Sequence, residues 1–123
     1  MKILIVDDNP DILDILSIIM EQDGHMTKTI DDGNDFNSSI ISFQPDLILL
    51  DIMLGQYDGR ELCSDLKSNI TTRHIPVIMI SASHFPESFF ERGCMPEGFI
   101  SKPFDIVHVS KTVNMVLTKA QPG

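Results

Sequence analysis

The sequence predicts a doubly wound α/β fold, in which a five-stranded parallel sheet is covered by helices on both faces. Short runs of consecutive aliphatic residues, such as residues 3–6 and 47–50, alternate along the chain with longer segments of helical period. A strand that is aliphatic at every position is buried on both faces, which is typical of parallel sheets. Five such strands, each followed by a helix and joined by right-handed crossovers, give a doubly wound sandwich.

The first strand and the first helix have the strongest patterns. Residues 2–7 form the strand, and residues 10–22 change to a helical period. Asn9 is a suitable N-cap, Pro10 suits the first turn and Gly24 suits the end of the helix. The apolar face of this helix is expected to consist of Ile12, Ile15, Leu16 and Ile19.

The other elements follow from the same criteria. Further strands are expected at residues 25–30, 46–51, 76–81 and 98–101, and further helices from about 36 to 43, 60 to 68 and 105 to 119. The connection between Ser81 and Gly98 also contains Pro86, Gly93 and Pro96. Since proline and glycine restrict helix length, only about residues 87–92 remain, and we expect a short or irregular fourth helix there.

Length and composition indicate one globular domain. The chain has 123 residues, of which 42% are hydrophobic, and we expect residues 1–120 to form the domain and residues 121–123 a frayed tail. The formal net charge of −9 argues against a direct nucleic-acid partner, because such binding needs cationic side chains. The apolar runs are too short for an export signal or a membrane span, so we expect a cytoplasmic protein without membrane insertion.

The cysteines and histidines carry no recognisable ligand pattern. Cys63 and Cys94 have neither metal-ligand spacing nor the pattern of a disulfide framework. Cys63 is expected to be a small buried hydrophobic residue on a helix. The four histidines are expected to be solvated or locally hydrogen-bonded, without a role in the chemistry; they are His25, His74, His84 and His108.

Carboxylate, hydroxyl and ammonium side chains lie at the carboxyl ends of four of the predicted strands. Asp7 and Asp8 follow the first strand, Asp51 ends the third, Ser81 ends the fourth and Lys102 follows the fifth. Ligands of doubly wound sheets bind beyond the carboxyl ends of the strands. Three converging carboxylates repel one another and attract a hard divalent cation such as Mg²⁺. An aspartate can act as a nucleophile toward a phosphoryl group, whose oxygens an ammonium and a hydroxyl can bind. The pattern therefore predicts a phosphoryl-transfer site.

Four motifs that contain these residues occur in a characteristic order. They are Lys2-Ile3-Leu4-Ile5-Val6-Asp7-Asp8, Asp51-Ile52-Met53-Leu54 with Asp58-Gly59, Ser81-Ala82, and Lys102-Pro103-Phe104. Together they resemble the receiver domain of two-component response regulators, over essentially the whole chain. The resemblance implies a flavodoxin-like, chemotaxis-regulator-like fold with strand order 2-1-3-4-5. The chain departs from the family at Gly55, where a proline is usual.

The resemblance implies a role for each acidic residue. Asp51 would be the phosphoacceptor. Asp8 would bind Mg²⁺ (or Mn²⁺ in its place) directly, and Asp7 would act mainly through a coordinated water. Asp51 would also contact the metal, and Met53 would offer its backbone carbonyl. The side chain of Met53 would then be free to vary.

The resemblance also implies roles at the other strand ends. Lys102 would hold the phosphoryl group, and Ser81 would move toward it on phosphorylation. Phe99 occupies the position of the family's second switch residue. The peptide bond before Pro103 would be cis, a rare geometry found almost only before proline.

The function implied is that of a phosphoacceptor signalling module. The donor would be a histidine kinase or a histidine phosphotransfer protein, and the phosphorylated form would control an unknown downstream protein as a monomer or a phosphorylation-dependent dimer. The chain would not be an enzyme, although it contributes groups to its own phosphorylation and slow dephosphorylation.

Two other functions share some of these features. A small Mg²⁺-dependent phosphohydrolase could form an aspartyl phosphate, but such enzymes usually carry an acid/base carboxylate two residues after the nucleophile, where this chain has Met53. A flavodoxin-like cofactor-binding protein is the other alternative. The acidic strand ends would repel a nucleotide phosphate, and no glycine-rich loop follows the first strand.

Overall fold

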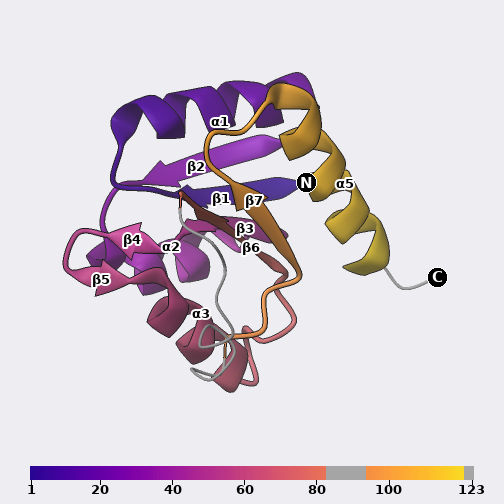
Figure 1. The fold of residues 1–123 in the computed structure, drawn as a ribbon. Helices are drawn as coiled ribbons and strands as arrows, with labels where there is room; N and C mark the ends of the chain where they lie inside the picture. The colour runs from indigo at the N-terminus through magenta and orange to yellow at the C-terminus, as the bar shows by residue number, and fades with distance from the viewer. Residues whose placement is uncertain (83–93, 121–123) are drawn as a thin grey trace.

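Five parallel strands form the central sheet of the protein. The computed structural model describes residues 1–82 and 94–120. The strands are β1 (Lys2–Val6), β2 (Met26–Ile30), β3 (Leu47–Asp51), β6 (Val77–Ser81) and β7 (Gly98–Ser101). Their order in the sheet is β2-β1-β3-β6-β7 (Figure 1). This order confirms the predicted 2-1-3-4-5 topology.

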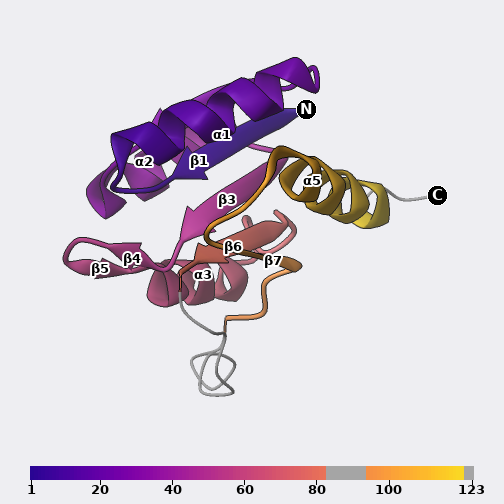
Figure 2. The same ribbon diagram turned by 45° about the horizontal axis from the view of Figure 1, so that its top comes forward.

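Helices cover both faces of this sheet. The helices are α1 (Pro10–Gln22), α2 (Phe36–Phe43) with the preceding turn η1 (Gly33–Asp35), α3 (Gly59–Ser68) and α5 (Ile106–Ala120). Helices α1 and α5 lie on one face, and α2 and α3 lie on the other (Figures 1 and 2). The predictions for residues 87–92, His84 and the tail at residues 121–123 lie outside the described residues.

Alternate residues of each strand face opposite helical layers, which explains the unbroken aliphatic runs. Ile3 and Ile5 belong to the core under α1 and α5, whereas Leu4 and Val6 belong to the core under α2 and α3. All four side chains are fully buried. At roughly 1.5–3 kcal/mol for each fully buried aliphatic side chain, the two-sided burial of the sheet is the main favourable contribution to folding.

The buried face of α1 differs in several positions from the prediction. Leu16 and Ile19 are buried together with Leu13 and Met20, whereas Ile15, which was expected on the apolar face, is 46% exposed. Ile15 lies at the edge of the buried stripe and lines a surface groove beside the start of α5. The spacing of apolar residues does not distinguish such an edge position from the centre of the stripe.

A small hairpin follows Asp51. Strands β4 (Met53–Leu54) and β5 (Tyr57–Asp58) pair antiparallel. Gly55 in the turn has a φ of 62°, which a proline cannot adopt because its ring holds φ near −65°. The glycine therefore suits the turn that this chain forms.

The two cysteines form a disulfide, so the prediction that they make no such bond was wrong. Cys63 lies on α3, and Cys94 lies in the coil that leads into β7. The prediction that Cys63 is buried is confirmed. The two residues are separated by 31 positions, and no local pattern could reveal that the fold brings them together.

The prediction that the His25 ring is solvated or locally hydrogen-bonded was also wrong. Among the described residues, neither of its ring nitrogens has a hydrogen-bond partner, although both nitrogens are shielded from solvent. Burial, followed by the positive charge of the chain's amino terminus, lowers the pKa of His25 below its ordinary value. The fold therefore favours the neutral ring.

We expect acid to weaken the fold through His25. A group whose pKa is lower in the folded protein binds more protons when unfolded, so its contribution to stability is lost as the pH falls below the unfolded value near 6.5. Urea unfolding of wild type and His25→Leu between pH 5 and pH 7.5 measures this effect. The advantage of the leucine variant should grow toward pH 5, and a constant difference across the range would contradict the assignment.

The helices of the protein do not have the properties of a membrane span in the part of the chain that the structure describes. Within residues 1–82 and 94–120, none combines the length and the apolar composition that crossing a bilayer requires.

Candidate functional site

The polar strand ends converge at one edge of the sheet. Asp51 is the last residue of β3, Asp7 directly follows β1, and Lys102 directly follows β7. Because β1 and β3 are neighbours in a parallel sheet, their carboxyl ends bring Asp7 and Asp51 together. The predicted juxtaposition is therefore present in the fold.

Three carboxylates form a compact oxygen-rich cluster at this edge. Asp7, Asp8 and Asp51 each offer a carboxylate oxygen, and these atoms lie within 4.8 Å of one another. Asp7 is 1% exposed and Asp51 is 4% exposed, whereas Asp8 is open to solvent. One side of the cluster is thus buried and the other can be reached by a ligand.

Lys102 bridges the two buried carboxylates. Its Nζ donates to Asp7 Oδ2 at 2.9 Å and to Asp51 Oδ2 at 3.4 Å. One ammonium thus partly neutralises two buried carboxylates. The shorter contact is to Asp7, so Asp51 is the less strongly compensated of the two.

The surroundings of Asp51 and Lys102 shift the pKa values of both groups. Burial, followed by repulsion from Asp7, raises the pKa of Asp51 to about 6, and the attraction of Lys102 and the Met53 amide only partly offsets these effects. Burial lowers the pKa of Lys102, but its hydrogen bonds and its attraction to Asp7 and Asp51 outweigh burial and raise that pKa above its ordinary value. At neutral pH the site therefore holds a destabilised carboxylate beside a charged ammonium.

Asp7 is held by the chain that leads into α1. The Asn9 amide donates to Asp7 Oδ1 at 2.9 Å, while the Asn9 side chain accepts from the Asp11 amide at 2.9 Å. Asn9 is therefore the N-cap of α1, as predicted. Asn9, rather than Asp7 or Asp8, makes the side-chain capping bonds of the helix.

The start of the hairpin supports Asp51. The Met53 amide donates to Asp51 Oδ1 at 3.4 Å, and the Gly59 amide donates to the Ile52 carbonyl at 2.6 Å. The Met53 side chain is 69% exposed, as expected if only its backbone matters. Gly59 thus closes the segment that begins with Asp51.

Tyr57 connects the β4–β5 hairpin to the neighbouring turn η1. Its hydroxyl donates to Asn34 Oδ1, and its ring lies against Gly33, where an added Cβ would come within 2.9 Å of the ring and its Cβ. Nothing local in the sequence links residue 57 to residues 33 and 34. Sequence reasoning therefore missed this support of the site.

The remaining predicted residues occupy different parts of the edge. Ser81 is buried at the end of β6, and its carbonyl accepts from the Lys102 amide at 2.8 Å. The Lys102–Pro103 peptide bond is cis, which is the geometry that the resemblance implied. Phe99 lies on β7, partly buried against the core under α2 and α3, and is therefore not part of the carboxylate cluster.

Comparison with known proteins identifies the family. The family model of the response regulator receiver domain matches residues 3–114. The chain belongs to the response regulator receiver family. It is therefore a receiver domain, a phosphoacceptor module of two-component signalling.

Two similar proteins are transcriptional regulators. The receiver domain is 34% identical over 121 residues to the DNA-binding dual master transcriptional regulator RpaA of Synechocystis, covering 96% of this chain and 49% of that protein. It is 31% identical over 125 residues to the alkaline phosphatase synthesis transcriptional regulatory protein PhoP of Bacillus subtilis, covering 98% of this chain and 50% of that protein. The chain spans about half the length of these relatives.

Solved structures show the same fold for receiver domains in other contexts. The receiver domain of a signal transduction histidine kinase from Syntrophus aciditrophicus is 31% identical, with a TM-score of 0.88 over 99% of this chain and 93% of that chain. The receiver domain of NtrX from Brucella abortus is 33% identical, with a TM-score of 0.83 over 94% of this chain and 98% of that chain. The fold class predicted from the strand pattern is thus confirmed.

Proposed function

We propose that Asp51 accepts the phosphoryl group of this receiver domain, from the phosphohistidine of a histidine kinase or a histidine phosphotransfer protein. The observation that carries this assignment is the pairing of a buried, destabilised Asp51 carboxylate with Lys102 Nζ at 3.4 Å. A carboxylate oxygen of Asp51 would attack phosphorus as the phosphorus–nitrogen bond to the donor histidine breaks. Transfer converts the Asp51 carboxylate into an acyl phosphate whose negative charge lies on the phosphoryl oxygens, one of which Lys102 can then bind.

The same cluster suits Mg²⁺. Its donors are oxygens, which hard divalent cations prefer, and within residues 1–82 and 94–120 the ammonium of Lys102 pairs with two of its three carboxylates. Asp8, Asp51 and the Met53 carbonyl would hold the ion directly, and Asp7 would act through water. A bound Mg²⁺ supplies positive charge that stabilises a phosphoryl group during transfer. Mn²⁺, which also prefers oxygen ligands, is the alternative ion.

Lys102 and Ser81 would bind the transferred group. The ammonium of Lys102 already lies between Asp7 and Asp51, so it can contact a phosphoryl oxygen without leaving the site. Ser81 ends β6 next to the Asp51 strand, where its hydroxyl could donate to another oxygen and thereby draw its backbone toward the phosphate. Phe99, on the adjacent strand β7, would change its packing in response.

The acid/base chemistry of a phosphohydrolase has no support at the expected position. That position is Met53, whose exposed side chain cannot transfer a proton. We therefore propose a signalling role and not an enzymatic one. We also propose that the partner is an unknown downstream protein and that the location is the cytoplasm.

Phosphorylation by a small donor tests the assignment. In Mg²⁺ and an acyl phosphate, the wild-type chain should gain one phosphoryl group by intact-protein mass spectrometry, and Asp51→Asn should gain none, because the variant lacks the nucleophilic carboxylate. Asp14→Asn is the matched control, since Asp14 is exposed on α1 and its substitution changes the net charge equally. Equal labelling of Asp51→Asn and wild type would refute the role of Asp51.

A further inference from the structure

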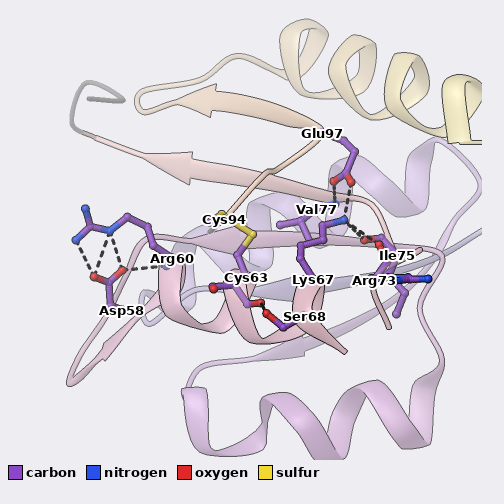
Figure 3. Close-up of a disulfide and its surroundings, with 11 residues drawn as sticks. Asp58, Arg60, Cys63, Lys67, Ser68, Arg73, Ile75, Val77, Cys94 and Glu97 are labelled. Carbon is purple, nitrogen blue, oxygen red and sulfur yellow. Dashed lines mark hydrogen bonds and ion pairs between the residues drawn. A yellow bond between two sulfur atoms is a disulfide. The ribbon is translucent and has the colours of Figure 1, made fainter. Parts of the chain in front are cut away.

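The disulfide joins two segments of the domain, neither of which contributes a residue to the carboxylate cluster. Cys63 lies on α3, and Cys94 lies in the coil before β7 (Figure 3). Their Cα atoms are 5.4 Å apart, within the usual range for disulfides, so no backbone movement is needed to form the bond. Both side chains are fully buried.

A second, non-covalent contact joins the same two segments. Lys67 lies one turn after Cys63 on α3, and Glu97 lies three residues after Cys94. Lys67 Nζ donates to Glu97 Oε1 at 2.5 Å, and Figure 3 shows this pair beside the disulfide. The contact holds the coil against α3 without any help from the sulfur atoms.

The backbone around Glu97 is also fixed to the sheet. Glu97 Oε2 accepts from the Val77 amide at 2.6 Å, and the Glu97 amide donates to the Val77 carbonyl at 2.8 Å. Lys67 Nζ additionally donates to the Ile75 carbonyl at 2.8 Å. These bonds would position Cys94 next to Cys63 even when both residues are thiols.

We propose that Cys63 and Cys94 form a reversible redox-modification site, which interconverts between a dithiol and the disulfide without rearrangement of the fold. Two thiols held at contact distance have a high effective concentration toward each other, which favours an intramolecular disulfide over mixed disulfides. The oxidised form ties α3 to the chain that enters β7, five residues before Phe99. The thiol chemistry does not involve Asp51, so the pair adds a second input to the receiver domain.

The oxidant is a small-molecule disulfide such as oxidised glutathione. One protein thiolate attacks a glutathione sulfur, which breaks the glutathione disulfide, releases one reduced glutathione and leaves a mixed disulfide. The second protein thiolate then attacks the protein sulfur of that mixed disulfide and releases the second glutathione. Two protein thiols are oxidised, one glutathione disulfide is reduced, and the two thiol protons pass to the two glutathione thiolates. Because both sulfurs are buried, exchange requires local opening and is slow.

The redox state should change the stability of the domain. A disulfide across a separation of 31 residues restricts the unfolded chain, and reduction should lower the Tm by about 10 °C. Oxidation should also slow hydrogen exchange in α3 and β7, because the bond suppresses opening between them. Neither readout depends on phosphorylation.

A glutathione redox titration of the full chain tests the proposal. The protein is equilibrated anaerobically with defined ratios of reduced to oxidised glutathione until the thiol count is constant, then alkylated and weighed by mass spectrometry. We expect a transition from two free thiols to none within the range of ratios, with the monomeric mass retained and the Tm rising in parallel. Cys63→Ala is the matched control, and its Tm should not depend on the redox state.

Four results would overturn the proposal. Two free thiols at the most oxidising ratio would show that the pair does not form a disulfide. A disulfide that persists in a large excess of reduced glutathione would show that the bond is a permanent structural element. Bonds between two chains, or stable glutathione adducts, would contradict the intramolecular pairing.

Discussion

Replacing Gly59 with alanine should destabilise the domain by on the order of 3 kcal/mol. A Cβ at this position would fall on the Asp51 carbonyl oxygen and 2.9 Å from Ile52 Cα. Both obstacles are backbone atoms of the segment that carries the phosphoacceptor, so the strain cannot be relieved by a side-chain rotation. Urea unfolding at a fixed redox state measures the loss, and phosphoryl labelling should decrease with it as Asp51 is displaced.

Gly55→Asn is the matched control for this substitution. Gly55 also lies in the hairpin region, but an added Cβ would meet no atom within 4 Å. Its φ of 62° is one that asparagine tolerates better than most residues. This variant should lose less than about 1 kcal/mol. A loss below that level for Gly59→Ala as well would contradict the close approach of residue 59 to Asp51.

Replacing Asp51 with asparagine should stabilise the metal-free protein at pH 7 by up to roughly 3 kcal/mol. The pKa of Asp51 is raised from 3.8 to about 6, first by burial and then by Asp7. A carboxyl group with a raised pKa binds its proton more tightly in the folded protein. Its ionisation therefore lowers stability as the pH rises from about 4 through 6, and the asparagine variant avoids that loss.

The pH dependence and the effect of Mg²⁺ make this prediction specific. With chelator present, the advantage of Asp51→Asn in urea unfolding should be small at pH 4 and should reach its full value above pH 7. Mg²⁺ should stabilise the wild type and reduce that advantage, because a bound cation offsets the carboxylate repulsion. Asp14→Asn should show neither effect. Equal stability of wild type and Asp51→Asn at pH 7 would contradict the destabilised state of Asp51.

The sequence was sufficient to predict the sheet and the residues at its carboxyl edge. Unbroken aliphatic runs require burial on two faces, and a parallel sheet sends all its carboxyl ends to one side. Asp7, Asp51 and Lys102 could therefore be grouped before any coordinates, as could the N-cap role of Asn9. These inferences depend only on strand direction and on local capping chemistry.

Contacts between distant segments could not be predicted in the same way. The bond between Cys63 and Cys94, the contact of Tyr57 with Asn34 and the burial of the His25 ring nitrogens all depend on how the helices and loops pack against the sheet. None of these contacts has a periodic or local sequence signal. The chemistry of the site was therefore predictable, whereas much of its support was not.

The role of Asp51 is tested most directly by identifying the residue that carries the phosphoryl group. The wild-type chain is phosphorylated by an acyl phosphate in Mg²⁺ and treated with borohydride, which reduces an aspartyl phosphate to homoserine. Peptide mass spectrometry then locates the converted residue. We expect homoserine at position 51 and at no other position, and only when both Mg²⁺ and donor are present. Conversion of Asp7 or Asp8 in place of Asp51, or conversion of no residue in a chain that has gained the phosphoryl mass, would contradict that role.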